Sequence, residues 1–416
     1  MTAVTFLNQQ PALRRLWWAS LLVFVLAAAT GAWLRYGLLY GFPGGLQFTN
    51  VRHAHSHLMY FGWVTPALMS LMAVYIGARS KRPFPRLLLL AIGLSILFGL
   101  VAYLPFLFYG YRPATVGQLN LPLSVIASAL NVLGWYLFAW QYYRWTKGLS
   151  RNMPLQIWDA AVGFMLLATL GVWGLPLLTA FNIDSILLSI GFTHLFLETF
   201  SNGWLLLGVL GLLYAAQPIT DGTPQRSQLV LAQRSHLLLV GGLPALFLLG
   251  MPTYSLTWPL QLIGGLAGLL VALGLWGHLI VLWPNSGPWR WALLFLGLKA
   301  MTVTAVILPP IARWAESSGL RVPYLHWLLL GWITLGLLLA ARDVGFTAVT
   351  RWWGYFVTAV ILVQLSLLPL TGLWPLDWGG RWTLQFAAIV AWTPAIIATI
   401  ILFTCRSTGS SQTTAY

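Results

Sequence analysis

Long apolar runs separated by short polar or basic segments fill most of the chain, and they show no alternation with a period of two. A helix needs roughly 20 apolar residues to cross a hydrocarbon core of about 30 Å. In lipid, every backbone polar group must bond within the protein, so only helices or closed barrels can span. Because a barrel requires alternation, the pattern predicts an all-α integral membrane protein.

Twelve of the apolar runs are long enough to be read as membrane-spanning helices. They cover residues 16–34, 57–76, 87–107, 121–142, 160–178, 186–214, 237–251, 260–282, 291–308, 324–339, 353–370 and 382–403. The seventh run is short and rich in glycine and proline. The connecting loops are short as well, so we expect one polytopic membrane domain over residues 1–416, with no separate soluble domain.

Composition agrees with a surface that faces membrane lipid. Charged residues make up only 7% of the 416-residue chain, and hydrophobic residues 59%, whereas a soluble domain carries about 25% charged residues. The net charge of +15 comes from Lys and Arg in short clusters between the apolar runs. That distribution is typical of membrane-protein loops and argues against nucleic acid as a partner.

The basic residues also predict how the chain is oriented. With the N-terminus in the cytoplasm, 15 Lys and Arg residues, Lys81 among them, fall on the cytoplasmic side and 6 fall outside. This excess favours an even number of spans in the inner (plasma) membrane, with both termini in the cytoplasm. The single cysteine, Cys405, excludes a disulfide framework, a cysteine-ligated iron–sulfur cluster and a c-type haem motif.

Histidines mark the start of two of the predicted spans. His53, His55 and His57 open the second run, and His326 opens the tenth. On a helix, His53 and His57 share a face and His55 points away. Four residues separate His57 from the dipeptide Gly62-Trp63, and the same spacing separates His326 from Gly331-Trp332.

The sixth run carries a related pattern. His194 is followed four residues later, on the same helix face, by Glu198 and then by Gly203-Trp204. His57, His194 and His326 follow one another at nearly equal spacing, one in the second helix of each group of four spans. We therefore expect a threefold internal repeat with four-helix units at about 16–142, 160–282 and 291–403.

Two imidazoles at equal depth on different helices are suited to binding haem. Neutral imidazole is a strong axial ligand to haem iron, so His57 and His326 are the candidate ligands of a haem b. Gly62 and Gly331, about one turn further along, would let a flat porphyrin approach the backbone. Arg52 is a candidate partner for the haem propionates.

The residues leave alternatives open. A histidine at the end of a span can be interfacial and bind no cofactor. His194 and Glu198 are candidates for a metal-binding, catalytic or proton-transfer role, or they tie two helices together by a hydrogen bond. Lys299 lies in the middle of the ninth run, and the sequence does not decide between an ion pair, snorkelling and proton movement.

Twelve spans with histidines on the second and the tenth resemble subunit I of the haem–copper oxidases and nitric oxide reductases. The resemblance implies three four-helix arcs, with His57 and His326 as ligands of the low-spin haem. It also implies that His194 is a ligand of an active-site copper or non-haem iron. An electron donor, either quinol, a cytochrome or another respiratory subunit, would then be a partner.

A second resemblance is local. The segment from His55 to Gly62 is similar to the His-x-His-x-Met-x-x-Gly stretch of the NnrS family, with Met59 in step. That family implies haem and copper in the response to nitric oxide. The candidate metal ligands would then be His53, His55, His57 and His194.

The chain departs from the oxidase pattern in the seventh and tenth runs, which carry one histidine each, His236 and His326. Two copper ligands and the high-spin haem ligand of an oxidase are therefore missing. We expect an oxidoreductase-like haem protein that is not a complete oxygen reductase. A twelve-span secondary transporter is the third hypothesis, because the seventh and eighth runs are interrupted by glycine and proline.

Overall fold

The computed structural model describes residues 1–80, 82–217, 223–375 and 378–407, so Lys81 lies outside the described residues. Within this part of the chain, 12 helical segments are long and apolar enough to cross a membrane. The expectation of an all-α, multi-pass membrane protein is confirmed. One short β-hairpin is the exception to the helical structure of the described chain.

Contacts divide the chain into two compact units, which are described separately. The first unit comprises Met1–Leu149, Leu337–Pro369 and Trp374–Tyr416, and the second comprises Ser150–Gly336 and Leu370–Leu373. The first unit thus contains the first four spans together with the last two. The second contains the fifth to ninth spans and the first part of the tenth.

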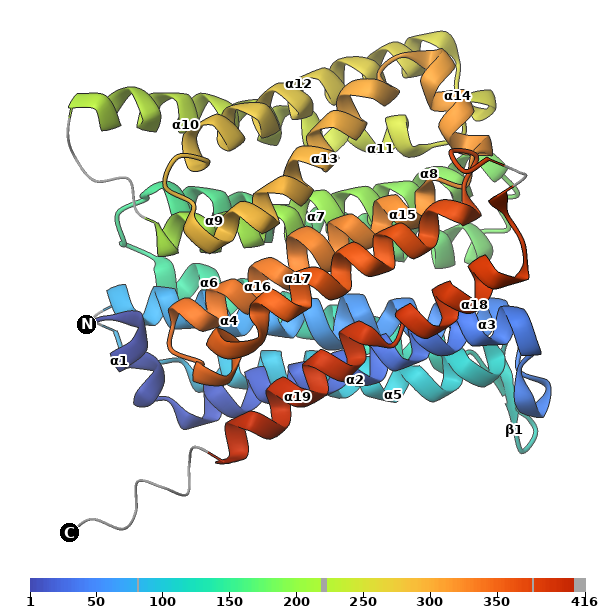
Figure 1. Ribbon diagram of the computed structural model, residues 1–416, viewed down its shortest axis with the longest axis horizontal. Coiled ribbons are helices and arrows are strands. Elements are labelled where there is room, and N and C mark those ends of the chain that lie inside the picture. Colours follow the sequence, from blue (N-terminus) through green and yellow to red (C-terminus); the bar gives the residue numbers. More distant parts are fainter. Residues whose placement is uncertain (81, 218–222, 376–377, 408–416) are drawn as a thin grey trace. The chain divides into compact units, whose positions relative to one another are not determined.

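The elements of the first unit follow the chain from the N-terminus and resume near residue 337 (Figure 1). They are α1 (Ala3–Asn8), α2 (Pro11–Tyr40), η1 (Pro43–Gly45), α3 (Phe48–His57), η2 (Leu58–Val64), α4 (Thr65–Arg79), α5 (Arg86–Tyr109), β1 (Ala114–Val116), β2 (Leu119–Leu121), α6 (Leu123–Thr146), α16 (Leu335–Asp343), α17 (Thr347–Leu367), η8 (Leu368–Leu370), α18 (Arg381–Val390) and α19 (Thr393–Ser407).

The second unit contains the remaining helices (Figure 1). They are α7 (Met153–Ala180), α8 (Ile186–Glu198), η3 (Thr199–Leu206), α9 (Leu207–Ala216), α10 (Thr223–Gly242), η4 (Leu243–Ala245), α11 (Leu246–Gly250), η5 (Thr253–Ser255), α12 (Trp258–Leu282), η6 (Gly287–Trp289), α13 (Arg290–Val306), α14 (Pro309–Ser317), α15 (Arg321–His326) and η7 (Trp327–Thr334).

Several spans begin earlier than the apolar runs predict. The second span covers Phe48–Arg79 and the seventh covers Arg226–Gly250, so the predicted starts at residues 57 and 237 were wrong. The additional turns carry polar and basic side chains, which lower the local hydropathy while the backbone stays helical. His53, His55 and His57 consequently lie inside a helix rather than at its start, about one and a half to two and a half turns after Phe48.

A π-helical segment interrupts the second, sixth and tenth spans at the same point of each. The segments are η2, with seven residues, and η3 and η7, with eight each. In all three, glycine is the fifth residue and tryptophan the sixth. The hydrogen bonds of a π turn span one residue more than those of an α-helix, and such turns are rare and frequently lie at functional sites.

The three glycines lie where each of these helices packs against the preceding span. A Cβ atom added to Gly62 would lie 2.6 Å from Val23 Cγ1 in α2. The corresponding atoms would lie 2.4 Å from Phe164 Cβ at Gly203, and 2.3 Å from Phe295 Cγ at Gly331. The space beside Gly62 and Gly331 is therefore occupied by a neighbouring helix. Because the same packing recurs in all three groups of spans, it supports the internal repeat.

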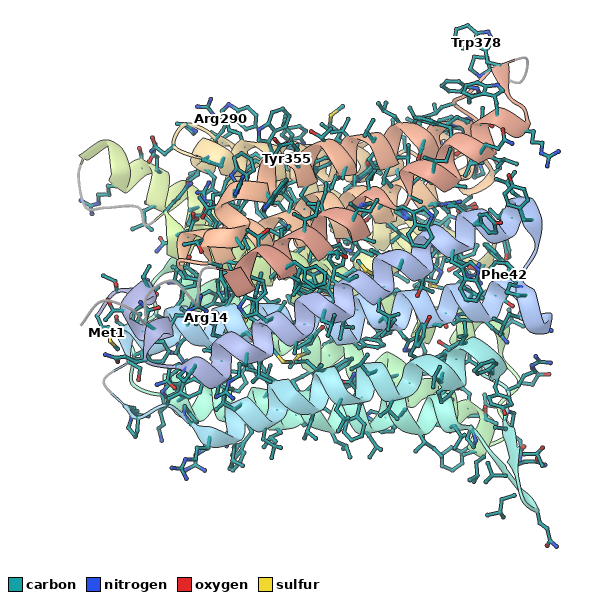
Figure 2. All side chains as sticks on the ribbon, turned by 60° about the horizontal axis from the view of Figure 1, so that its bottom comes forward. Met1, Arg14, Phe42, Arg290, Tyr355 and Trp378 are labelled. Atoms are coloured by element: carbon teal, nitrogen blue, oxygen red, sulfur yellow. The ribbon has the colours of Figure 1, made fainter. Side chains whose placement is uncertain are left out.

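Helix α2 is central to the first unit and contacts α3, η2, α4, α18 and α19. Phe24 on α2 stacks on Trp63 with ring centroids 5.0 Å apart, and Trp17 packs on Phe346 at 4.4 Å. Figure 2 shows Arg14 near one end of α2 and Phe42 beyond the other. Aromatic side chains thus pack in the contacts between α2 and its neighbours.

In the second unit, α12 packs along α10 and α13, and α7 packs along α8, η3 and α9. Trp158 donates its indole N–H to the Gly208 carbonyl at 3.0 Å, and Trp332 donates to the Leu206 carbonyl at 3.4 Å. These bonds satisfy two buried indoles and join separate spans.

Substitution of Gly99 tests a contact of the first unit in which the backbones of two helices meet. A Cβ atom at Gly99 would lie 2.7 Å from the Gly62 Cα, so Gly99→Leu forces α5 and η2 apart. We expect a loss of about 1–3 kcal/mol or more, seen as a lower midpoint of thermal unfolding in detergent. Gly93→Leu on the same helix is the control, since its Cβ would meet only Leu16 Cδ2, at 3.9 Å. Equal midpoints for the two variants would contradict this packing.

Candidate functional site

His53 and His57 form an aromatic cluster with Phe106 and Tyr111 in the first unit. The His57 ring stacks on Phe106 with centroids 3.7 Å apart, and His57 Nε2 lies 3.3 Å from Tyr111 Oη. The His53 ring meets Tyr111 edge-on at 4.8 Å. Nδ1 of His57 is buried and has no hydrogen-bond partner among the described residues. One nitrogen of this imidazole is therefore held by Tyr111, whereas the other is buried without a partner from the described residues.

Tyr111 reaches His57 because the loop after α5 is tied down. Asn50 donates to the Phe108 carbonyl at 3.1 Å, and Ser124 donates to the Gly110 carbonyl at 2.7 Å. The hairpin of β1 and β2 follows, with Ala114 paired to Leu121. Burial raises the pKa of the Tyr111 hydroxyl, so the hydroxyl stays protonated near neutral pH and can accept the Nε2 hydrogen of His57.

His55 faces another helix, as its position in the sequence predicts. Its Nδ1 lies 2.8 Å from the Ala27 carbonyl of α2, and its ring lies against Gly31. The candidate metal ligands His53, His55 and His57 therefore do not converge. In the part of the chain that the structure describes, no three His, Cys, Asp or Glu side chains come together as a set of metal ligands.

His326 is the last residue of α15 in the second unit. Its Nδ1 lies 2.8 Å from the Val322 carbonyl one turn earlier. Such a bond fixes the ring and directs Nε2, on its far side, away from the helix backbone. His57 and His326 belong to different units, and each is positioned by its own neighbours. Arg52 is an exposed residue of α3, next to His53.

The π segments show which residues are equivalent in the repeat. His57 immediately precedes η2, Glu198 immediately precedes η3, and His326 immediately precedes η7. The expectation that His194 corresponds to His57 and His326 was therefore wrong by one helical turn. His194 corresponds instead to His53. The sequence comparison aligned residues of the same type, histidine with histidine. The position of the π segment in each span shows instead which residues are structurally equivalent.

Glu198 and His194 do not pair in the structure. Glu198 Oε2 accepts a hydrogen bond of 2.6 Å from Asn202 Nδ2, and Glu198 Oε1 lies beside Gly250 of α11. His194 is 6% exposed, and its Nδ1 has no hydrogen-bond partner among the described residues. The hydrogen bond between His194 and Glu198, which the sequence offered as one alternative, is therefore not formed.

Lys299 of α13 is 2% exposed and donates a hydrogen bond to Tyr324 Oη. Its Nζ also lies over the Tyr324 ring, 4.7 Å from the centroid. Lys299, Tyr324 and Glu198 line one cavity of about 420 Å³ within the second unit. A lysine and a glutamate that lie 101 residues apart in the sequence thus face a common space.

Sequence reasoning missed the groups that hold the candidate residues. Tyr111 comes from a loop, Asn202 from a π segment and Tyr324 from α15, the helix that ends at His326. None of the three belongs to a recognisable sequence motif. The two tyrosines in particular do not stand out, because tyrosine near the end of a span is common in membrane proteins. Their positions relative to His57, Glu198 and Lys299 arise only from the folding of separate helices.

Neither the known protein families nor the curated proteins include a significant match to this sequence.

Proposed function

We propose that this chain is a membrane redox protein that binds b-type haem through His57 and His326, as in subunit I of the haem–copper oxidases. The observation that carries the proposal is the shared register of the two histidines. Each precedes a π segment by one residue, with glycine and tryptophan at the fifth and sixth positions. The second and tenth spans therefore share a local backbone geometry, and each has a histidine directly before its π segment.

The hydrogen bonds of the two rings fit a ligand role. Metal-binding histidines usually hold one ring nitrogen with a carbonyl, carboxylate or water and coordinate with the other. His326 Nδ1 is held by the Val322 carbonyl, and His57 Nε2 is held by Tyr111. The unpartnered Nδ1 of His57 is the atom that would bind iron. Phe106 stacks on the His57 ring and covers one of its faces.

Haem bound in this way would supply reversible one-electron transfer, and the residues of the chain would orient and insulate it. The basic side chain of Arg52 would pair with a propionate. An electron donor such as quinol, a cytochrome or another respiratory subunit would complete the function. A second candidate is an NnrS-like haem and copper protein, which the shared face of His53 and His57 favours.

Replacement of either histidine by alanine should remove the low-spin haem. We expect the purified protein to show a Soret band and a reduced α-band, and we expect His57→Ala and His326→Ala each to lose them. His53→Ala, one turn away on the same face, is the matched control and should keep both bands. The measurement is a reduced-minus-oxidised spectrum with haem and copper quantified. Unchanged spectra in both ligand variants would refute the assignment, and copper lost with His53 would favour the second candidate.

Orientation can be tested with reporter fusions, since we propose that both termini lie in the cytoplasm. Alkaline phosphatase folds only outside the cytoplasm. Its fusion after Gly117, in the hairpin loop, should therefore be active, and its fusion after Gly148 should be inactive. The opposite result would place Tyr111 and His57 near the cytoplasmic face.

A further inference from the structure

The cavity of the second unit is lined by four charged side chains, two acidic and two basic. Its volume is about 420 Å³, within the usual range for small-molecule sites. The sequence contains two glutamates, Glu198 and Glu316, and both line it. Lys299 and Arg321 line it too. Of the three lysines in the sequence, Lys299 is the one that lies within a described span, Gly287–Val306.

These four charges do not neutralise one another by contact. The described residues form ion pairs between Arg151 and Asp159 and between Arg342 and Asp343, and no such pair includes a charge of the cavity. Glu316 instead accepts hydrogen bonds from the backbone N–H and the hydroxyl of Thr253, at 2.9 and 3.4 Å. Ionised groups within a membrane are costly and are normally paired, so separated charges around an open space indicate a missing partner.

We propose that this cavity binds a small zwitterion with an apolar body, such as an apolar amino acid. The charges of the lining sum to zero, so a ligand of net zero charge leaves the cavity neutral. Opposite charges on one small molecule would satisfy both Glu198 and Lys299. A purely cationic or anionic ligand would satisfy one and repel the other.

The lining also suggests the pose of the ligand. The ammonium group faces Glu198, whose Oε1 is not engaged by Asn202. The carboxylate accepts from Lys299, and Arg321, an exposed residue of the lining, attracts the same end. The apolar body packs on aliphatic side chains of the wall, namely Leu246, Leu249, Val303 and Val306. Gly250 is needed beside Glu198, because a Cβ atom there would lie 3.0 Å from Glu198 Oε1.

This site is independent of the haem proposal. In the repeat, Glu198 stands where the other two π segments are preceded by histidine, so the second π segment presents a carboxylate in place of a metal-binding imidazole. Neither of the proposed haem ligands, His57 and His326, lines the cavity. The protein can therefore fail to bind a zwitterion and still show the haem spectrum. It can equally lack the haem spectrum and still bind a zwitterion.

The test is equilibrium binding to the purified full-length protein in lipid nanodiscs. The probes are radiolabelled L-leucine, L-phenylalanine and L-methionine, with two leucine analogues as competitors. 3-Methylbutylamine keeps the ammonium group, and 4-methylpentanoate keeps the carboxylate. We expect saturable binding of at least one amino acid, and for leucine we expect each analogue to compete about tenfold more weakly or worse, because it leaves one charge unpaired.

Variants then assign the binding to the cavity. Glu198→Gln and Lys299→Met should each weaken binding at least about tenfold and leave the haem spectrum unchanged. Asp184→Asn, an exposed carboxylate of the same unit outside the cavity, is the matched control and should bind as the unmodified protein does. The proposal is overturned if none of the three amino acids binds, if either analogue competes as well as the amino acid, or if Glu198→Gln binds normally. The analogue comparison uses the unmodified protein, so it stands even if a variant fails to fold.

Discussion

The close approach of helices at three glycines is the contact on which both units depend. Between helices in lipid the hydrophobic effect offers little, so association relies on tight packing at small residues. Gly62, Gly203 and Gly331 each receive a side chain of the preceding span where a Cβ atom would stand. The tryptophan that follows each glycine is fully buried. A π turn lies at the same point of each of the three spans, and the helix continues through it. The glycine can therefore pack against the preceding span while the tryptophan that follows it stays buried.

The same backbone device supports different chemistry in different repeats. The residue that precedes the π segment is histidine in the second and tenth spans and glutamate in the sixth. Single π turns inside α-helices frequently lie at functional sites. The residue before the turn differs in chemical type between the repeats, while the glycine and the tryptophan maintain the same helix contacts.

Much of the architecture was predictable from the sequence, because twelve apolar runs in a lipid solvent have few other structures available. Helix ends were less predictable. The second span starts at Phe48 because polar residues continue the helix where hydropathy falls. The equivalence of Glu198 with His57 could not be read from residue type, since it depends on a backbone feature. The cavity was not predictable either, because Glu198, Lys299 and Glu316 come from separate helices and share no motif.

Tyrosine hydroxyls hold the ionisable side chains in both units. Tyr111 lies 3.3 Å from the His57 ring nitrogen, Tyr324 accepts from Lys299, and Tyr214 lies 2.8 Å from Nδ1 of the fully buried His278. A carboxylate in the place of Tyr324 would neutralise Lys299 and remove its attraction for a ligand. A hydroxyl on an apolar ring gives a hydrogen bond at little desolvation cost and adds no charge. Such a partner positions the side chain and leaves the charge of Lys299, or the second ring nitrogen of His57 and His278, without a partner from the described residues.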